Sequence, residues 1–332
     1  MKVFTDPVEN KQNLNRQLAL YEDGNFACQE CKHEMALEEV HPLSMVECPE
    51  CKSVNFVPLK LDRFLLFRPL GGGGMGSVYK GYDPEGERNS FVAVKVLSRE
   101  GKNCPTTIRA LLNEGRIANI IGDHPCLTKC LASGYENGEY YCALEYVEGQ
   151  RLDQMIELRG KIDEKIVMQI ALHLLAAEQH VYNCGYLYRD MKPENIIINN
   201  DGYAVLVDYG LCQTRKLALN PREEFVSGSP YYLPPERLLG EGEDACSEIY
   251  SLGMVMYYAI TGETFFNASE AEKLAKRHVS NLQLPLATKM KGLDPNLIKI
   301  LSAMVNQDPK KRFQGFAQVA NQIRRYIESI SS

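Results

Sequence analysis

The apolar and polar positions divide the chain into a strand-rich part followed by a helix-rich part. From Phe64 onward, short apolar stretches such as Val78–Tyr82 and Phe91–Leu97 are separated by glycines, as expected for β-strands and turns. After about residue 150, apolar residues recur every three or four positions, which is typical of amphipathic helices. The order of these elements predicts an α+β fold.

Residues 164–183 form the clearest predicted helix. Asp163 is in the position of an N-cap and Gly185 in the position of a helix stop. The predicted apolar stripe consists of Ile166, Val167, Ile170, Leu174, Leu175 and Val181. A stripe of this width predicts a helix that is packed along one face.

Two CxxC pairs near the N-terminus predict a metal site. Cys28 and Cys31 form one pair, Cys48 and Cys51 the other, and sixteen residues separate the pairs. Each tight turn aims two sulfurs at one point, so two turns supply the tetrahedral set of thiolates that Zn²⁺ prefers, at about 2.3 Å. The spacing predicts a zinc ribbon over residues 25–60. Free or redox-active cysteines are the weaker alternative, because no βαβ pattern surrounds either pair.

The neighbourhood of the ribbon indicates how it is attached. Residues 1–24 form a polar leading segment (the polar lead), for which a short helix and a disordered conformation are both open. The join from Pro58 to Arg63 is short and not rich in Gly or Ser, so the ribbon is expected close to the next domain. His33 and His41 lie in the spacer and are interpreted as surface residues, since four cysteines already close the site.

Charge, apolar runs and cysteine content indicate which partners and which cellular compartment to expect. The 332 residues carry a net charge of −6, so no nucleic-acid partner is expected. The longest apolar run, Leu252–Ile260, is too short to span a bilayer, and the start lacks the apolar segment of a signal peptide. A cytoplasmic location without a membrane segment is therefore expected, and the eleven cysteines do not indicate a disulfide framework. Cys104 is expected to be exposed, and the small core cysteines to be Cys126, Cys130, Cys142, Cys184, Cys212 and Cys246.

A glycine-rich stretch matches the pattern GxGxxGxV through Gly71, Gly73, Gly76 and Val78. Glycines let the backbone approach phosphates closely and offer unhindered N–H donors. A dinucleotide-binding fold would need a helix directly after this stretch, but a strand is predicted there, which favours a hairpin that covers phosphates. Taken alone, the motif also fits a simple turn.

Two isolated charges on apolar faces are expected to pair. Lys95 lies in the apolar strand Phe91–Leu97 and needs a partner if it is buried. Glu114 lies on the apolar face of a predicted helix over residues 108–121. A surface location is reasonable for either charge singly and less so for both.

Five later segments carry a resemblance to the protein kinase superfamily. Tyr188–Ile198 resembles its HRD-type catalytic loop and Val205–Leu211 its DFG-type metal site. Further matches are Gly228–Glu236, Ser247–Gly253 and Asp308–Arg312, the last of which would pair Arg312 with Glu236. The glycine loop and the Ile-Tyr-Ser-Leu-Gly helix are similar to those of bacterial eukaryotic-like Ser/Thr kinases.

The resemblance covers about residues 64–327 and implies a bilobal protein kinase fold preceded by the zinc ribbon. An antiparallel five-stranded N-lobe with one main helix would occupy residues 61–146, and a helical C-lobe residues 147–332. ATP would bind between the lobes.

The resemblance also implies catalytic roles. Asp190 would accept or orient the proton of the substrate hydroxyl, and Lys192, typical of Ser/Thr kinases, would neutralise the transferring phosphoryl group. Asn195 and Asp208 would hold Mg²⁺ or Mn²⁺. Lys95 would contact the α- and β-phosphates and pair with Glu114. The adenine would meet the side chains of Val78, Ala93 and Ile197 and the backbone of Glu145 and Val147, with Leu144 as gatekeeper.

Several positions depart from the family pattern. Tyr188, Tyr209 and Pro234 replace His, Phe and Ala with little expected effect. Glu248 replaces the Asp that braces the catalytic loop. The charge is kept, and the effect of the extra methylene on the bracing geometry is left open.

The activation segment, which would run from Asp208 to Glu236, and its neighbourhood carry the candidates for regulation. Arg189 is typical of kinases activated by phosphorylation. Glu223 and Glu224 are weighed as substitutes for a phosphate against a solvated charge pair, which is slightly favoured. Thr214 and Ser227 are candidate autophosphorylation sites.

The motifs together predict a Ser/Thr protein kinase that uses ATP on protein hydroxyls, including its own. The alternative is a nucleotide-binding pseudokinase or scaffold whose ribbon docks partners. Such proteins normally lose at least one of six residues that are all present here: Lys95, Glu114, Asp190, Lys192, Asn195 and Asp208. The activation segment is intact through Glu236. Because this segment receives a protein substrate, it argues against a small-molecule kinase. A ribbon that is itself the functional centre stays open.

Overall fold

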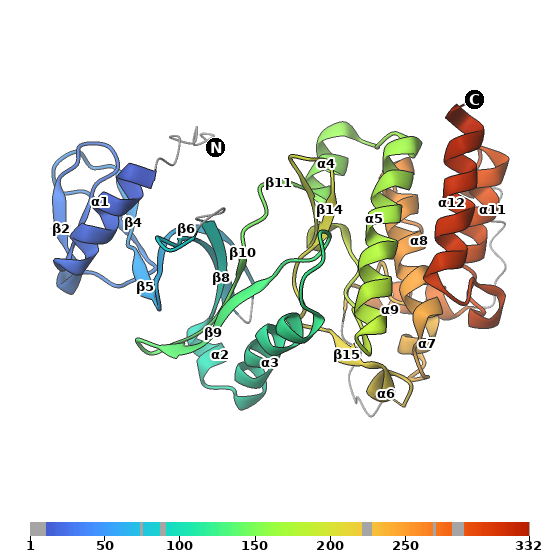
Figure 1. Cartoon of the computed structure of the whole chain (residues 1–332), viewed down its shortest axis with the longest axis horizontal. Coiled ribbons are helices and arrows are strands. Elements are labelled where there is room, and N and C mark those ends of the chain that lie inside the picture. Colours follow the sequence, from blue (N-terminus) through green and yellow to red (C-terminus); the bar gives the residue numbers. More distant parts are fainter. Residues whose placement is uncertain are drawn as a thin grey trace. The chain divides into compact units, whose positions relative to one another are not determined.

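The computed structural model describes residues 11–73, 76–86, 91–220, 228–267, 270–280 and 289–331. These residues belong to two compact units. The first unit comprises residues 1–116 and 129–146, and the second comprises residues 117–128 and 147–332. Figure 1 shows the elements of both units.

The first unit begins with helix α1 and two short hairpins. Helix α1 spans Lys11–Glu22, so the described part of the polar segment contains the short helix. Four strands follow as two antiparallel pairs: β1 (Asn25–Ala27) with β2 (Glu34–Ala36), and β3 (Met45–Glu47) with β4 (Val54–Phe56). A small core of Phe26, Cys28, Met35, Cys48 and Val57 lies between the hairpins.

The rest of the first unit is an antiparallel sheet with the order β5-β6-β7-β8-β10-β9. Its strands are β5 (Leu59–Leu61), β6 (Phe64–Gly73), β7 (Gly76–Tyr82), β8 (Phe91–Leu97), β9 (Cys130–Glu136) and β10 (Glu139–Glu145). Helices α2 (Arg99–Lys102) and α3 (Pro105–Ile121) lie between β8 and β9 in the sequence. The sheet therefore has six strands and not the expected five. The additional strand is β5, because Leu59 and Leu61 of the join bury their side chains in the sheet core.

The ribbon and the helix α1 before it pack against this sheet, in agreement with the short join. Leu14 of α1 is buried with Leu65 and Tyr82 of the sheet. The Tyr82 hydroxyl donates to Asn15 Oδ1 at 2.7 Å. The Phe56 ring of β4 lies 5.8 Å from the Tyr79 ring of β7. The ribbon and the sheet that carries the glycine stretch thus share apolar contacts within one unit.

The second unit is mostly helical. Its strands are β11 (Gly149–Arg151), β13 (Ile196–Asn199) and β14 (Ala204–Leu206) in one sheet, and β12 (Tyr186–Leu187) with β15 (Gln213–Thr214) in another. The described helices are α4 (Leu152–Arg159), α5 (Glu164–Asn183), α6 (Arg215–Ala218), α7 (Pro235–Leu238), α8 (Ala245–Thr261), α9 (Ala271–Val279), α11 (Pro295–Met304) and α12 (Phe316–Ser331). Helix α5 packs against both α8 and α12 (Figure 1).

Helix α5 follows its predicted bounds. The Asp163 side chain accepts hydrogen bonds from the backbone of Lys165 and Ile166, and Gly185 has a positive φ of 89° after the last turn. The predicted stripe is buried except for Ile166, which is 39% exposed. At 3.6 residues per turn, Ile166 lies about 100° from the centre of the buried face.

The cysteine expectations are partly confirmed. Cys104 is exposed, and Cys126, Cys142 and Cys212 are buried. Cys130, Cys184 and Cys246 are only half-buried, so the expectation that they are core residues was too strong.

Candidate functional site

The charged pair expected in the first unit is present. Lys95 Nζ lies 2.8 Å from Glu114 Oε2, and the Glu114 side chain is 2% exposed. Lys95 comes from β8 and Glu114 from α3. Taking Glu114 out of water would be costly without a cation nearby, so Lys95 stabilises its carboxylate while its own amine stays partly accessible.

The glycine stretch forms the expected hairpin rather than a strand-to-helix turn. Gly71 pairs with Val78, and Gly73 with Gly76, across β6 and β7. A Cβ atom at Gly76 would lie 2.3 Å from the Val96 carbonyl oxygen, so the close approach of β7 to β8 requires glycine here. Gly74 and Met75 lie outside the described residues.

The cross-strand register gathers most of the predicted nucleotide residues on one face of the sheet. Val78 pairs with Lys95, and Ala93 pairs with Leu144. Directly paired residues, and residues two positions apart on one strand, point to the same face. Glu145, at the end of β10, pairs with Val92. Ile197 and Val147 belong to the second unit.

The catalytic-loop residues of the second unit are held by one another. Lys192 Nζ donates to Asp190 Oδ2 at 2.7 Å, and Asn195 Nδ2 donates to the same oxygen at 2.7 Å. Asn195 Nδ2 also donates to the Asp190 backbone carbonyl at 3.1 Å. Two donors on one oxygen fix the orientation of the carboxylate and leave Asp190 Oδ1 without a donor from either of them.

Backbone contacts place Asp208 beside this loop. The Val207 N–H donates to the Asn195 carbonyl at 3.0 Å, and the Tyr188 hydroxyl donates to the Val207 carbonyl at 2.8 Å. Asp208 follows directly with a φ of 79°, and its Oδ1 accepts the Gly210 N–H at 2.9 Å. Tyr188, which replaces the usual His, therefore ties the two motifs together.

Glu248 makes the bracing contact that the sequence left open. Both of its carboxylate oxygens accept the Arg189 backbone N–H, at 3.0 and 3.1 Å. Burial raises the pKa of Glu248, and the positive charge of Arg237 opposes this rise. The brace is intact because the carboxylate approaches the single N–H with both oxygens.

Three residues of this region were missed from the sequence. Glu243 and Arg237 form a buried ion pair with an N–O distance of 2.6 Å. Glu178 is also buried, and burial together with the charge of Glu248 raises the pKa of Glu178 well above its usual range. Glu243 lies in a Gly-Glu-Gly-Glu stretch that is typical of an exposed loop, so no sequence signal indicated its burial.

The other predicted pair of the second unit is confirmed. Arg312 and Glu236 are joined by two hydrogen bonds of 2.7 and 2.9 Å. Thr214, a candidate phosphorylation site, is half-buried in β15. Glu223, Glu224 and Ser227 lie outside the described residues.

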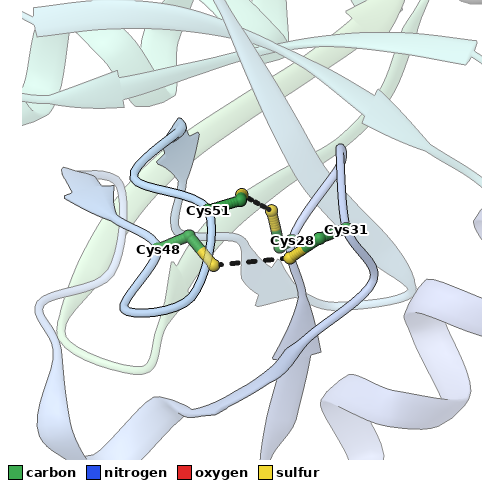
Figure 2. A group of neighbouring side chains, drawn as sticks. All are labelled: Cys28, Cys31, Cys48 and Cys51. Atoms are coloured by element: carbon green, nitrogen blue, oxygen red, sulfur yellow. Dashed lines mark hydrogen bonds between the residues drawn. The ribbon is translucent and has the colours of Figure 1, made fainter.

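The four ribbon cysteines converge on one point, as Figure 2 shows. Their sulfur atoms all lie within 4.8 Å of one another, with Cys28–Cys51 and Cys31–Cys48 distances of 3.6 Å. These distances exclude disulfides, which need about 2.05 Å. Four sulfurs at about 2.3 Å from a tetrahedral Zn²⁺ would be about 3.8 Å apart, which fits the cluster. Neither His33 nor His41 belongs to the group.

The two cysteine turns are built alike and surrounded by donors. The N–H of Lys32 donates to the Cys28 carbonyl at 3.1 Å and that of Lys52 to the Cys48 carbonyl at 3.0 Å. Ser53 Oγ lies 3.1 Å from the sulfurs of both Cys28 and Cys51. Burial acts to raise the pKa of the Cys28 thiol, but hydrogen bonds from Ser53 and from two backbone groups lower it to about 5. Such donors favour the thiolate, which is the form that binds metal.

Comparison with known proteins agrees with this geometry. Residues 64–324 match the family model of the protein kinase domain. The chain belongs to the protein kinase family. The ribbon lies outside the matched range.

Several bacterial kinases are among the curated relatives of this chain. It is 28% identical over 265 residues to a probable serine/threonine-protein kinase of Clostridium perfringens, covering 80% of this chain and 38% of that protein. It is 30% identical to the serine/threonine-protein kinase PrkC of Bacillus subtilis, covering 76% and 38%. The match to PknB of Mycobacterium tuberculosis is 28% identical and covers 78% and 42%. The kinase thus spans about two fifths of the length of these relatives. Within the described residues, no helix combines the length and the apolar character needed to cross a membrane.

Proposed function

We propose that this kinase transfers the γ-phosphoryl group of ATP to Ser or Thr hydroxyls of proteins, with autophosphorylation among its reactions. The observation that carries the proposal is the Asp190 carboxylate, which Lys192 and Asn195 both orient through Oδ2. The substrate hydroxyl oxygen attacks the γ-phosphorus, the bond to the β-phosphate oxygen breaks to release ADP, and Asp190 takes the hydroxyl proton. Catalysis of this kind depends mainly on position and charge neutralisation.

The remaining roles follow the chemistry of each group. Lys95, held by Glu114, binds the α- and β-phosphates, and the backbone at Gly71, Gly73 and Gly76 covers the phosphates. Asn195 and Asp208 would hold Mg²⁺ or Mn²⁺, which would supply positive charge to neutralise the phosphates. The adenine is held by Val78, Ala93, Leu144 and Ile197 and by the backbone of Glu145 and Val147. The shared sheet face of Val78, Ala93, Lys95 and Leu144 supports this assignment.

We propose further that Cys28, Cys31, Cys48 and Cys51 hold a structural Zn²⁺. Four sulfur ligands leave no open position for substrate, so the metal would act on stability rather than chemistry. We place the protein in the reducing cytoplasm, where cysteines stay available as the thiolates that bind the metal.

Transfer of labelled phosphate tests the enzymatic proposal. Purified protein is incubated with Mg²⁺ and ATP labelled at the γ-phosphate, with Asp208→Asn as the matched variant. We expect phosphoserine or phosphothreonine on the chain or on a generic protein substrate with the wild type alone. Nucleotide binding without transfer by the wild type would instead favour a scaffold. Zinc is measured on the same preparation, and a content far below one per chain would reject the structural metal.

A further inference from the structure

The side chain of Arg189, the residue before Asp190, is bound by a buried glutamate. Arg189 Nε and Nη2 lie 3.0 and 2.9 Å from Glu243 Oε1. The side chains are 5% and 1% exposed, so water barely screens this contact. Two donors on one carboxylate oxygen fix the position of the guanidinium.

Arg237 completes the cluster from the other side. Its Nε and Nη2 lie 2.8 and 2.6 Å from Glu243 Oε2. Its Nη1 donates to the Arg189 backbone carbonyl at 2.7 Å. Together with the brace from Glu248 to the Arg189 N–H, both backbone polar groups of Arg189 are therefore held. Arg189 has a φ of 68°, a region that L-residues avoid, so these contacts maintain a strained residue directly before Asp190.

Glu243 is also tied to the segment that follows Asp208. Its N–H donates to the Ala218 carbonyl at 2.9 Å, and Ala218 ends helix α6. A Cβ atom on the neighbouring Gly242 would lie 2.5 Å from the Leu219 carbonyl oxygen, which shows how closely the two segments approach. One residue thus connects three segments: the Glu243 carboxylate binds the catalytic loop and α7, and its backbone N–H binds the segment that follows Asp208.

A phosphate on an activation segment stabilises a kinase by pairing with such an arginine. We infer that Glu243 is a permanent counter-charge for Arg189, which holds the catalytic loop in its transferring conformation without a phosphate on the activation segment. The inference rests on the proposed function and deepens it. Glu243 then has the role of phosphate substitute that was weighed from sequence for Glu223 and Glu224. Glu243 is a positioning residue, since it acts on Asp190 through Arg189.

The test compares two neighbouring glutamates in the full chain. Glu243→Gln removes the buried charge and keeps the shape, whereas Glu241→Gln alters an exposed glutamate in the same loop. We expect Glu243→Gln to lower kcat at least tenfold with an unchanged KM for ATP, and Glu241→Gln to stay within twofold. Phosphatase-treated wild type and the Thr214→Ala/Ser227→Ala variant should keep kcat within twofold of untreated wild type.

A second measurement does not depend on activity. Hydrogen exchange over residues 186–195 should be faster in Glu243→Gln than in Glu241→Gln. Equal exchange, equal kcat for the two variants, or loss of wild-type activity after phosphatase treatment would each overturn the inference. A wild type that never transfers phosphate would reject the proposed function, and the exchange experiment would still decide whether Glu243 positions the loop.

Discussion

The Arg189 backbone N–H is shared by both carboxylate oxygens of Glu248, at 3.0 and 3.1 Å. Glu248 comes from the first turn of α8, and Arg189 from the loop that presents Asp190. A glutamate therefore does here what a shorter aspartate does in the family pattern. The loop and α8 are placed so that the longer side chain reaches the N–H.

This placement predicts that the shorter residue is worse in this chain. Glu248→Asp should withdraw the carboxylate from the Arg189 N–H, and Glu248→Ala should leave that buried donor unpaired. An unpaired buried donor costs about 1–3 kcal/mol. We expect Glu248→Ala to lower both kcat and the free energy of unfolding, with Glu248→Asp intermediate. Denaturant unfolding and steady-state kinetics check this, and a Glu248→Asp variant more active than wild type would contradict it.

The pair of Lys95 and Glu114 predicts unequal effects of its two members. Lys95→Met removes the proposed phosphate contact and leaves Glu114 buried without this cation, so kcat/KM for ATP should fall about 100-fold or more. Glu114→Gln keeps Lys95 and should cost less. Lys102→Met, which removes the half-exposed pair with Glu139 in the same unit, is the matched control. An equal loss in Lys102→Met would show that the effect is general destabilisation.

Removal of zinc should weaken the kinase sheet as well as the ribbon. Phe56 and Leu14 contact Tyr79 and Tyr82 of β7, so the sheet loses support when the cysteine cluster opens. We expect Cys28→Ser to lose zinc and about 3 kcal/mol of stability, which lowers Tm by roughly 6–12 °C. Calorimetry and metal analysis measure both changes. Cys104→Ser, at an exposed cysteine, should leave both unchanged.

The raised pKa of Glu178 predicts a pH dependence of stability. Burial and the charge of Glu248 hold the folded-state pKa of Glu178 well above the ordinary 4.5. The folded state therefore keeps a proton that the unfolded state releases, and stability falls as pH rises from about 4.5 towards the folded-state pKa. Glu178→Gln removes this term, so its stability relative to wild type should increase over that range. A pH-independent difference in unfolding free energy between the two proteins would contradict the prediction.

Several features of this protein could be predicted from sequence because they depend on local chemistry. The two CxxC turns, the caps of α5 and the order of the kinase motifs depend on residues close together in the chain, where spacing alone dictates geometry. The pairing of Lys95 with Glu114 was also predictable, because each charge interrupts an otherwise apolar face.

Features that depend on partners distant in the chain emerged only from the folded structure. Strand β5 exists because Leu59 and Leu61 find a place at the edge of a sheet formed by later residues. Arg189 and Glu243 are 54 residues apart, and a glutamate between glycines carries no local mark of burial. The order of residues sets the chemistry available at each position, while folding selects which charges lose their water and must therefore pair with one another.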